Sequence, residues 1–130
     1  MRDPLYAPAW EQPSDDVAFD EFAALEAAEA CRGAAAVAAE AGLVRHQAGV
    51  VADSFFRGVF AERFRVQHDD AVDLHSVLAE TLAHTANRIE QAAVEAVAEQ
   101  RRRDVLRDEW EDEYRRNVAA AARYEPDGPR

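Results

Sequence analysis

The stretch Asp53-Ser-Phe-Phe-Arg-Gly-Val-Phe-Ala-Glu-Arg-Phe64 decides the fold, because it interrupts a long helix-forming sequence near its midpoint. On either side lie roughly forty residues dominated by good helix formers, with no proline among them. Gly58 readily adopts the backbone angles that a tight turn needs. We therefore expect a turn at residues 54–58 and an all-α fold, a long antiparallel two-helix hairpin.

A helix-packing seam is predicted from apolar residues that recur in alternating steps of four and three. Before the turn the series runs from Ala23 to Phe55, and small side chains dominate it. Gly33, Gly42 and Gly49 each cost about 1 kcal/mol against Ala inside a helix, so tertiary contacts must stabilise this segment. The larger residues of the predicted seam are Val37, Val44, Val51, Phe60, Leu74, Leu78, Leu82 and Ile89.

The rest of the chain is organised around this hairpin. Residues 1–13 contain Pro4, Pro8 and Pro13 and are predicted to form an extended arm. The hairpin is predicted over 14–98, with its first helix starting near Ser14 or Asp15. Residues 99–118 read as a charged, largely solvated helical extension, in which Trp110 and Tyr114 offer a possible docking surface. Residues 119–130 are predicted to be a flexible tail.

Composition excludes several classes of function. The chain has 130 residues, with 26 acidic against 15 basic ones and a net charge of -11, which disfavours nucleic acid as a partner. No stretch has the apolar length of a membrane span, and the first ten residues lack the apolar core of a Sec signal peptide. All basic residues are Arg, which is typical of a GC-rich genome such as an actinobacterial one.

No catalytic or metal-binding pattern emerges. Cys31 is the only cysteine, and we interpret it as a small helix residue. His68, Asp69 and His75 could share one helix face, and Glu80 precedes His84 by four. Di-metal carboxylate bundles instead use Glu-x-x-His, together with glutamates from other helices. We expect no enzyme, no cofactor and no metal.

A lone hairpin covers only one side of each helix. Apolar residues beside the predicted seam would then stay exposed, and a patch of that size usually marks a partner surface. We therefore expect an obligate homodimer or heterodimer, completed as a four-helix bundle. These flanking residues are Phe22, Leu25, Leu43, Val50, Val72 and Val77.

The turn resembles the WXG family of small type VII (ESX-like) secretion substrates. Their hallmark is Trp-x-Gly between two helices, often continued as Trp-x-Gly-x-x-Ala-x-x-Phe, and the matching positions here are Phe56, Gly58, Ala61 and Phe64. Phe replaces the Trp of the motif. The likeness also covers the Ala-rich first helix and the missing signal peptide, over roughly residues 17–100.

The resemblance implies a helical hairpin that binds itself or a second WXG-like hairpin, and that is secreted without a Sec signal peptide or stays cytoplasmic before export. It also implies contact with a secretion ATPase or a larger toxin-like substrate, with Phe56 and Gly58 in recognition. The family signal Tyr-x-x-x-Asp/Glu is not matched, since Val118 follows Tyr114 and Gly128 follows Tyr124, so the signal would lie on a partner. The alternatives are a cytoplasmic helical scaffold or adaptor unrelated to secretion, and a motif that serves only the turn and its packing.

Overall fold

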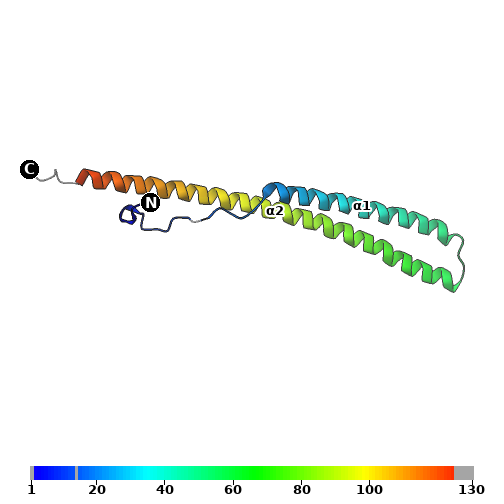
Figure 1. Cartoon of the computed structure of the whole chain (residues 1–130). Coiled ribbons are helices and arrows are strands. Elements are labelled where there is room, and N and C mark those ends of the chain that lie inside the picture. Colours follow the sequence, from blue (N-terminus) through cyan, green and yellow to red (C-terminus); the bar gives the residue numbers. More distant parts are fainter. Residues whose placement is uncertain (1, 14, 125–130) are drawn as a thin grey trace, which may run out of the picture. The chain divides into compact units, whose positions relative to one another are not determined.

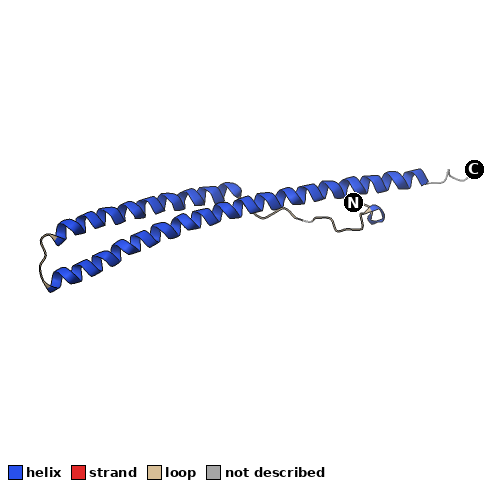
Figure 2. Cartoon of the chain, turned by 180° about the vertical axis from the view of Figure 1, so that it is seen from behind, coloured by secondary structure: helices blue, strands red, loops and turns tan. Residues whose placement is uncertain are grey.

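The structure is a computed structural model that describes residues 2–13 and 15–124. Its elements are the 3₁₀ turn η1 (Pro4–Tyr6), the helix α1 (Glu21–Asp53) and the helix α2 (Val59–Tyr124). Within the described residues all regular structure is helical, which confirms the predicted all-α class (Figure 2). Helix α1 and the first half of α2 lie side by side and antiparallel, so the predicted hairpin is confirmed (Figure 1).

The chain divides into two compact units. Residues 20–94 form the hairpin unit, which contains α1, the turn and the first half of α2. The second unit combines the N-terminal arm, up to Phe19, with the chain from Glu95 onward. We refer to these as the hairpin unit and the arm unit.

Helix α1 begins at Glu21, later than the start predicted near Ser14 or Asp15. Asp20 is its N-cap, and the Asp20 carboxylate accepts a hydrogen bond of 3.0 Å from the backbone N–H of Ala23. The acidic residues that suggested an earlier start are used elsewhere. The carboxylate of Asp16 pairs with Arg107, and the backbone carbonyl oxygen of Asp15 accepts a hydrogen bond from Arg103, so tertiary contacts hold this segment outside the helix. Ser14 lies outside the described residues.

Helix α2 continues to Tyr124, so the predicted flexible tail is wrong for residues 119–124. The alanines at 119–122 explain the difference, because Ala is the strongest helix former and needs no tertiary contact to extend a helix. Residues 125–130 of the predicted tail lie outside the described part of the chain.

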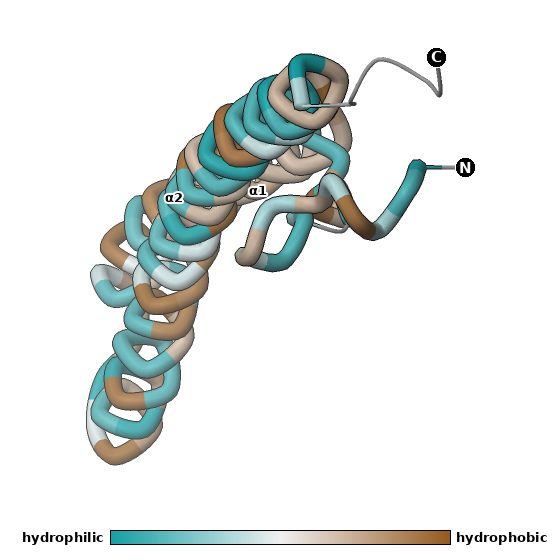
Figure 3. The backbone as a smooth tube through the Cα atoms, turned by 90° about the vertical axis from the view of Figure 1, so that its left-hand side faces the viewer, coloured by the Kyte–Doolittle hydropathy of each residue, from teal (hydrophilic) through white to brown (hydrophobic). Residues whose placement is uncertain are grey.

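The hairpin unit has a core made of alanine. Every apolar residue classed as buried in it is Ala, and no large side chain among its described residues is fully buried. Larger apolar residues recur at short intervals along the surface of α2, where they appear brown in Figure 3. Small inner side chains let two helices approach closely but remove little apolar area from water. The buried alanines are Ala28, Ala35, Ala38, Ala61, Ala86 and Ala93.

Neither described helix has a segment long and apolar enough to cross a membrane.

Candidate functional site

The turn brings the four motif residues to one end of the hairpin unit. Gly58 has a φ of +77°, a left-handed conformation that L side chains rarely adopt. Its carbonyl oxygen accepts hydrogen bonds from the backbone N–H of Ala61 (3.1 Å) and of Glu62 (3.4 Å), which start α2. Ala61 is 2% exposed. Gly58 and Ala61 therefore set the geometry of the turn.

An aromatic row extends from the turn between the helices. The Phe56 and Phe64 ring centroids are 5.1 Å apart, and Phe64 stacks on His68 at 5.6 Å. His68 in turn stacks on His46 of α1 at 6.2 Å. Phe56 remains 42% exposed, so it packs on Phe64 with one part and faces solvent with the other. The predicted motif is thus a contiguous cluster, partly accessible at its outer end.

Two glycines of α1 provide space for histidine rings of α2. A Cβ on Gly49 would overlap the ring of His68, and a Cβ on Gly42 would lie 2.9 Å from Cβ of His75. The Nε2 atom of His68 is buried and makes no hydrogen bond to the described residues. Gly42 and Gly49 are therefore needed because the two helices approach closely at these positions, and not because a turn requires them.

The contact between the helices uses a different register from the predicted one. On α1 the inner positions are one residue later than predicted, and on α2 they include His68, Ala71, His75 and Ala79. The prediction that these eight large residues pack between α1 and α2 was therefore wrong for six of them, which are exposed. The other two, Leu82 and Ile89, are half-buried. The physical reason is that the face of α1 with the smallest side chains, Ala and Gly, lets α2 pack most closely. The six exposed residues are Val37, Val44, Val51, Phe60, Leu74 and Leu78.

Part of the predicted seam instead forms an open apolar surface. We call Val37, Val44, Val51, Leu74 and Leu78 the valine face; their exposed fractions run from 51% to 69%. A shallow groove crosses it, and His75 lines that groove from α2. Leu74 and Leu78 are exposed on α2, and Leu78 lies one helical turn after His75. Its lining is Val37, Glu40, Ala41, Val44, Arg45, Ala48 and His75.

Polar bridges close the hairpin at two points. Arg32 of α1 pairs with Glu90 of α2 and donates a hydrogen bond of 3.1 Å to Asn87. Across the turn, Arg65 pairs with Asp53 at 2.5 Å. The Arg32 hydrogen bond lowers the pKa of Glu90 below its ordinary value. Because these ion pairs are exposed, they contribute little to the free energy of unfolding, and their main effect is on the alignment of the two helices.

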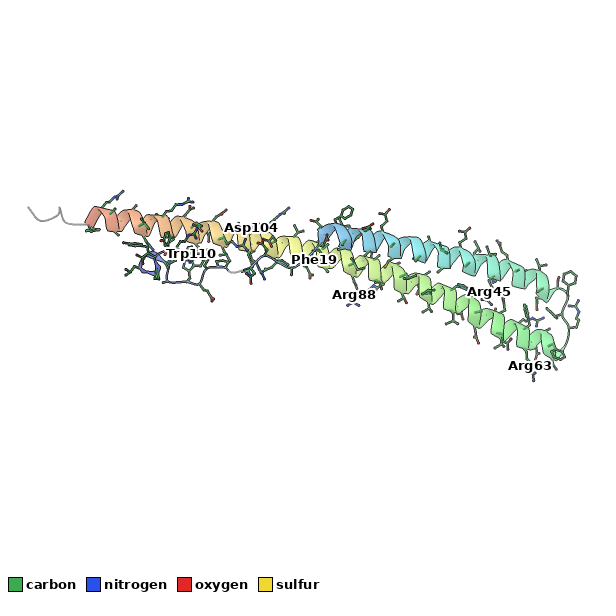
Figure 4. All side chains as sticks on the ribbon, in the orientation of Figure 1. Phe19, Arg45, Arg63, Arg88, Asp104 and Trp110 are labelled. Carbon is green, nitrogen blue, oxygen red and sulfur yellow. The ribbon has the colours of Figure 1, made fainter. Side chains whose placement is uncertain are left out.

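In the arm unit, the predicted docking pair is already covered. Trp110 is 6% exposed, its ring stacks on Tyr114 at 5.6 Å, and Tyr6 contacts Tyr114 edge-on at 6.4 Å. Figure 4 shows Trp110 on the side of α2 along which the arm runs. The extension was predicted to be largely solvated, and this is wrong for Trp110, because the arm of the same chain packs on it.

The described residues contain no group of three or more His, Cys, Asp and Glu side chains arranged to hold a metal ion. His68, Asp69 and His75 do not form such a group. His68 packs against Gly49 of α1, and His75 packs against Gly42. Comparison with family models, characterised proteins and solved structures finds no match to this chain.

Proposed function

We propose that this chain is a WXG-like helical hairpin that is exported by, or escorts a partner to, a type VII secretion system, and that it acts by helix–helix binding. The partner is a second copy or another hairpin of the same kind. A four-helix bundle with that partner would cover the valine face. Contact with a secretion ATPase or a larger toxin-like substrate belongs to the same proposal.

The observation that carries the binding function is the composition of the inner contact. The hairpin encloses alanines and glycines and leaves most of its valines, leucines and phenylalanines exposed, while Phe64, Val72 and Leu82 are half-buried. A stable monomer ordinarily buries its large apolar residues. An exposed heptad series of Val and Ala on α1 has the spacing that a third helix needs for knobs-into-holes packing.

The secretion assignment rests on the turn. Phe56 packs on Phe64, Ala61 is buried and Gly58 has a left-handed φ, at the four positions that resemble the family motif. Phe56 keeps an exposed edge through which a secretion component could recognise it. This part of the proposal comes from resemblance and geometry together.

Binding is tested by light scattering on size-exclusion fractions over a concentration series. Val44→Asp places a charge in the groove and should dissociate the assembly. Val66→Asp is the matched control, because Val66 is an exposed valine of α2 that lies outside the groove and away from the inner contact. A compact, stably folded wild-type monomer at micromolar concentration would overturn the binding proposal. Equal effects of the two substitutions would remove the valine face from it.

Secretion is tested by measuring export into culture supernatant for Phe56→Ala, with Phe55→Ala as the control. Phe55 is exposed and has no aromatic partner among the described residues. We expect Phe56→Ala to impair export more than it lowers thermal stability. Parallel losses of stability and export would assign Phe56 to packing alone. A dimer that is never exported would favour the helical scaffold over the secretion partner.

A further inference from the structure

In the arm unit, one side of α2 binds the N-terminal arm of the same chain. The surface is the stripe of α2 that recurs in alternating steps of three and four, and all of its members are buried or half-buried. We call it the arm stripe. Its residues are Gln100, Arg103, Arg107, Trp110, Tyr114 and Asn117.

The arm stripe binds the main chain of an extended segment. Asn117 donates a hydrogen bond of 2.9 Å to the carbonyl oxygen of Tyr6, and the indole N–H of Trp110 donates one of 3.3 Å to that of Trp10. Further along, Arg103 donates to the carbonyl oxygen of Asp15 at 2.7 Å. Side chains of the helix thus satisfy backbone groups that an extended arm would otherwise leave to water.

Two backbone N–H groups of the arm are bound in the same way. The N–H of Asp3 donates to the hydroxyl oxygen of Tyr114 at 3.0 Å, and the N–H of Val17 donates to Oε1 of Gln100 at 2.7 Å. These contacts lie at opposite ends of the arm. The arm is therefore held along its whole length, antiparallel to α2.

Charge gives the arm stripe a direction. At one end Arg2 pairs with Glu111, and its guanidinium lies 5.6 Å from the ring centroid of Trp110. Near the other end of the arm, Asp16 pairs at 2.7 Å with Arg107, which lies one helical turn before Glu111, and that contact lowers the pKa of Asp16. An occupant must place a cation first, aromatic residues in the middle and a carboxylate last. A segment running the other way would bring its cation to Arg107 and its carboxylate to Glu111.

We infer that the arm stripe also binds the arm of a second copy of this chain, so that two copies exchange arms reciprocally. The arm has the required order of cation, aromatics and carboxylate, and every contact described above is non-covalent. The arm's hydrogen bonds and ion pairs go to α2 beyond residue 94, and only the short segment before α1 tethers it. The exchanged form repeats the same contacts, which makes swapping of such an element a low-cost route to association.

The test uses complementary full-length variants. Tyr6→Ala/Trp10→Ala weakens the arm and leaves the arm stripe intact, whereas Trp110→Ala/Tyr114→Ala does the opposite. Each carries Cys31→Ser and one new cysteine for a fluorophore. The chain with the intact arm is labelled through Ala9→Cys, and the chain with the intact stripe through Asp108→Cys; both positions are exposed. Mixing them leaves exchange as the only way to form a complete arm contact.

We expect energy transfer in this mixture to exceed that in two control mixtures, in which both chains carry the same defect. The hairpin unit is unchanged in all three, so association through the valine face contributes equally and its failure stays distinguishable from that of the exchange. Asn117→Ala in the chain with the intact stripe should weaken its affinity for the intact arm by up to about tenfold, as loss of one hydrogen bond does, and so reduce the excess transfer. Equal transfer in all three mixtures would overturn the inference.

A second measurement covers the case in which a variant folds poorly. A synthetic peptide of residues 1–19 is titrated into the full-length Tyr6→Ala/Trp10→Ala chain, with a scrambled peptide of identical composition as the control. Saturable binding of the native peptide alone supports the arm stripe as a site that can be filled from outside. Absence of binding to the helical, folded variant would overturn it.

Discussion

Replacing Gly49 by Ala should destabilise the hairpin, although the same change elsewhere in α1 should stabilise it. In an open helix interior, Ala is more favourable than Gly by about 1 kcal/mol. Gly33 is such a position, because a Cβ placed there meets no atom within 4 Å. Gly33→Ala should therefore raise the free energy of unfolding by about 1 kcal/mol.

At Gly49 the added Cβ would overlap the ring of His68. The ring cannot simply withdraw, because it is stacked between Phe64 and His46. Overpacking of this kind costs about 1–3 kcal/mol. The two effects oppose one another, so Gly49→Ala should end about 1–3 kcal/mol less stable than Gly33→Ala.

The assay is urea unfolding followed by far-ultraviolet circular dichroism, at one fixed protein concentration because association adds to apparent stability. The double variant Gly49→Ala/His68→Ala removes the obstructing ring, so the second substitution should cost less than His68→Ala costs alone. If Gly49→Ala stabilises the chain as much as Gly33→Ala does, the two helices do not meet at Gly49 and the register described above is refuted.

Three further outcomes can be measured on the same chain. Gly58→Ala should lower the free energy of unfolding by about 1–2 kcal/mol, since a Cβ is unfavourable at a φ of +77°; an unchanged urea midpoint would contradict the turn geometry. Hydrogen bonds from Arg102 and then Arg103 lower the pKa of Glu99 from 4.5 to about 2, so its contribution to stability exists above the ordinary pKa and is lost as pH falls through the lowered one. Glu99→Gln should accordingly lower the melting temperature at pH 7, with the difference closing as the pH approaches about 2, and a difference independent of pH would refute the ion pairs. Trp10→Ala should release the arm and increase acrylamide quenching of Trp110, whereas Trp110 that stays protected would show that the arm does not cover it.

The sequence predicted the hairpin, its turn and the role of Gly58, because these depend on local propensity and on one residue with unusual backbone freedom. It did not predict which face of α1 lies inside. Two neighbouring faces of α1 are both apolar, and the series of alternating steps of four and three selected the face with more valine. A usable signal was the small residue at every seventh position, formed by Ala28, Ala35, Gly42 and Gly49.

The packing of the arm on α2 could not be predicted from the local spacing of apolar residues. Its partners are separated by more than eighty residues, as Val17 and Gln100 are, and no helical spacing connects them. The heptad series nevertheless continues through the charged extension, in Trp110, Tyr114 and Asn117. A stripe of that regularity indicates a covering element, but the sequence does not say which one.

The inner register also determines how strongly association and folding are linked. Burying one Val or Leu side chain is worth about 1.5–3 kcal/mol, so the five residues of the valine face represent on the order of 10 kcal/mol per chain. Two proteins that associate lose freedom worth about 4–15 kcal/mol, so the available surface exceeds that cost only if most of it is covered. An alanine core contributes little of its own, so a partner that covers the valine face would supply much of the stability of the hairpin. The melting temperature should therefore rise with protein concentration, and Val44→Asp should abolish that dependence while Val66→Asp preserves it.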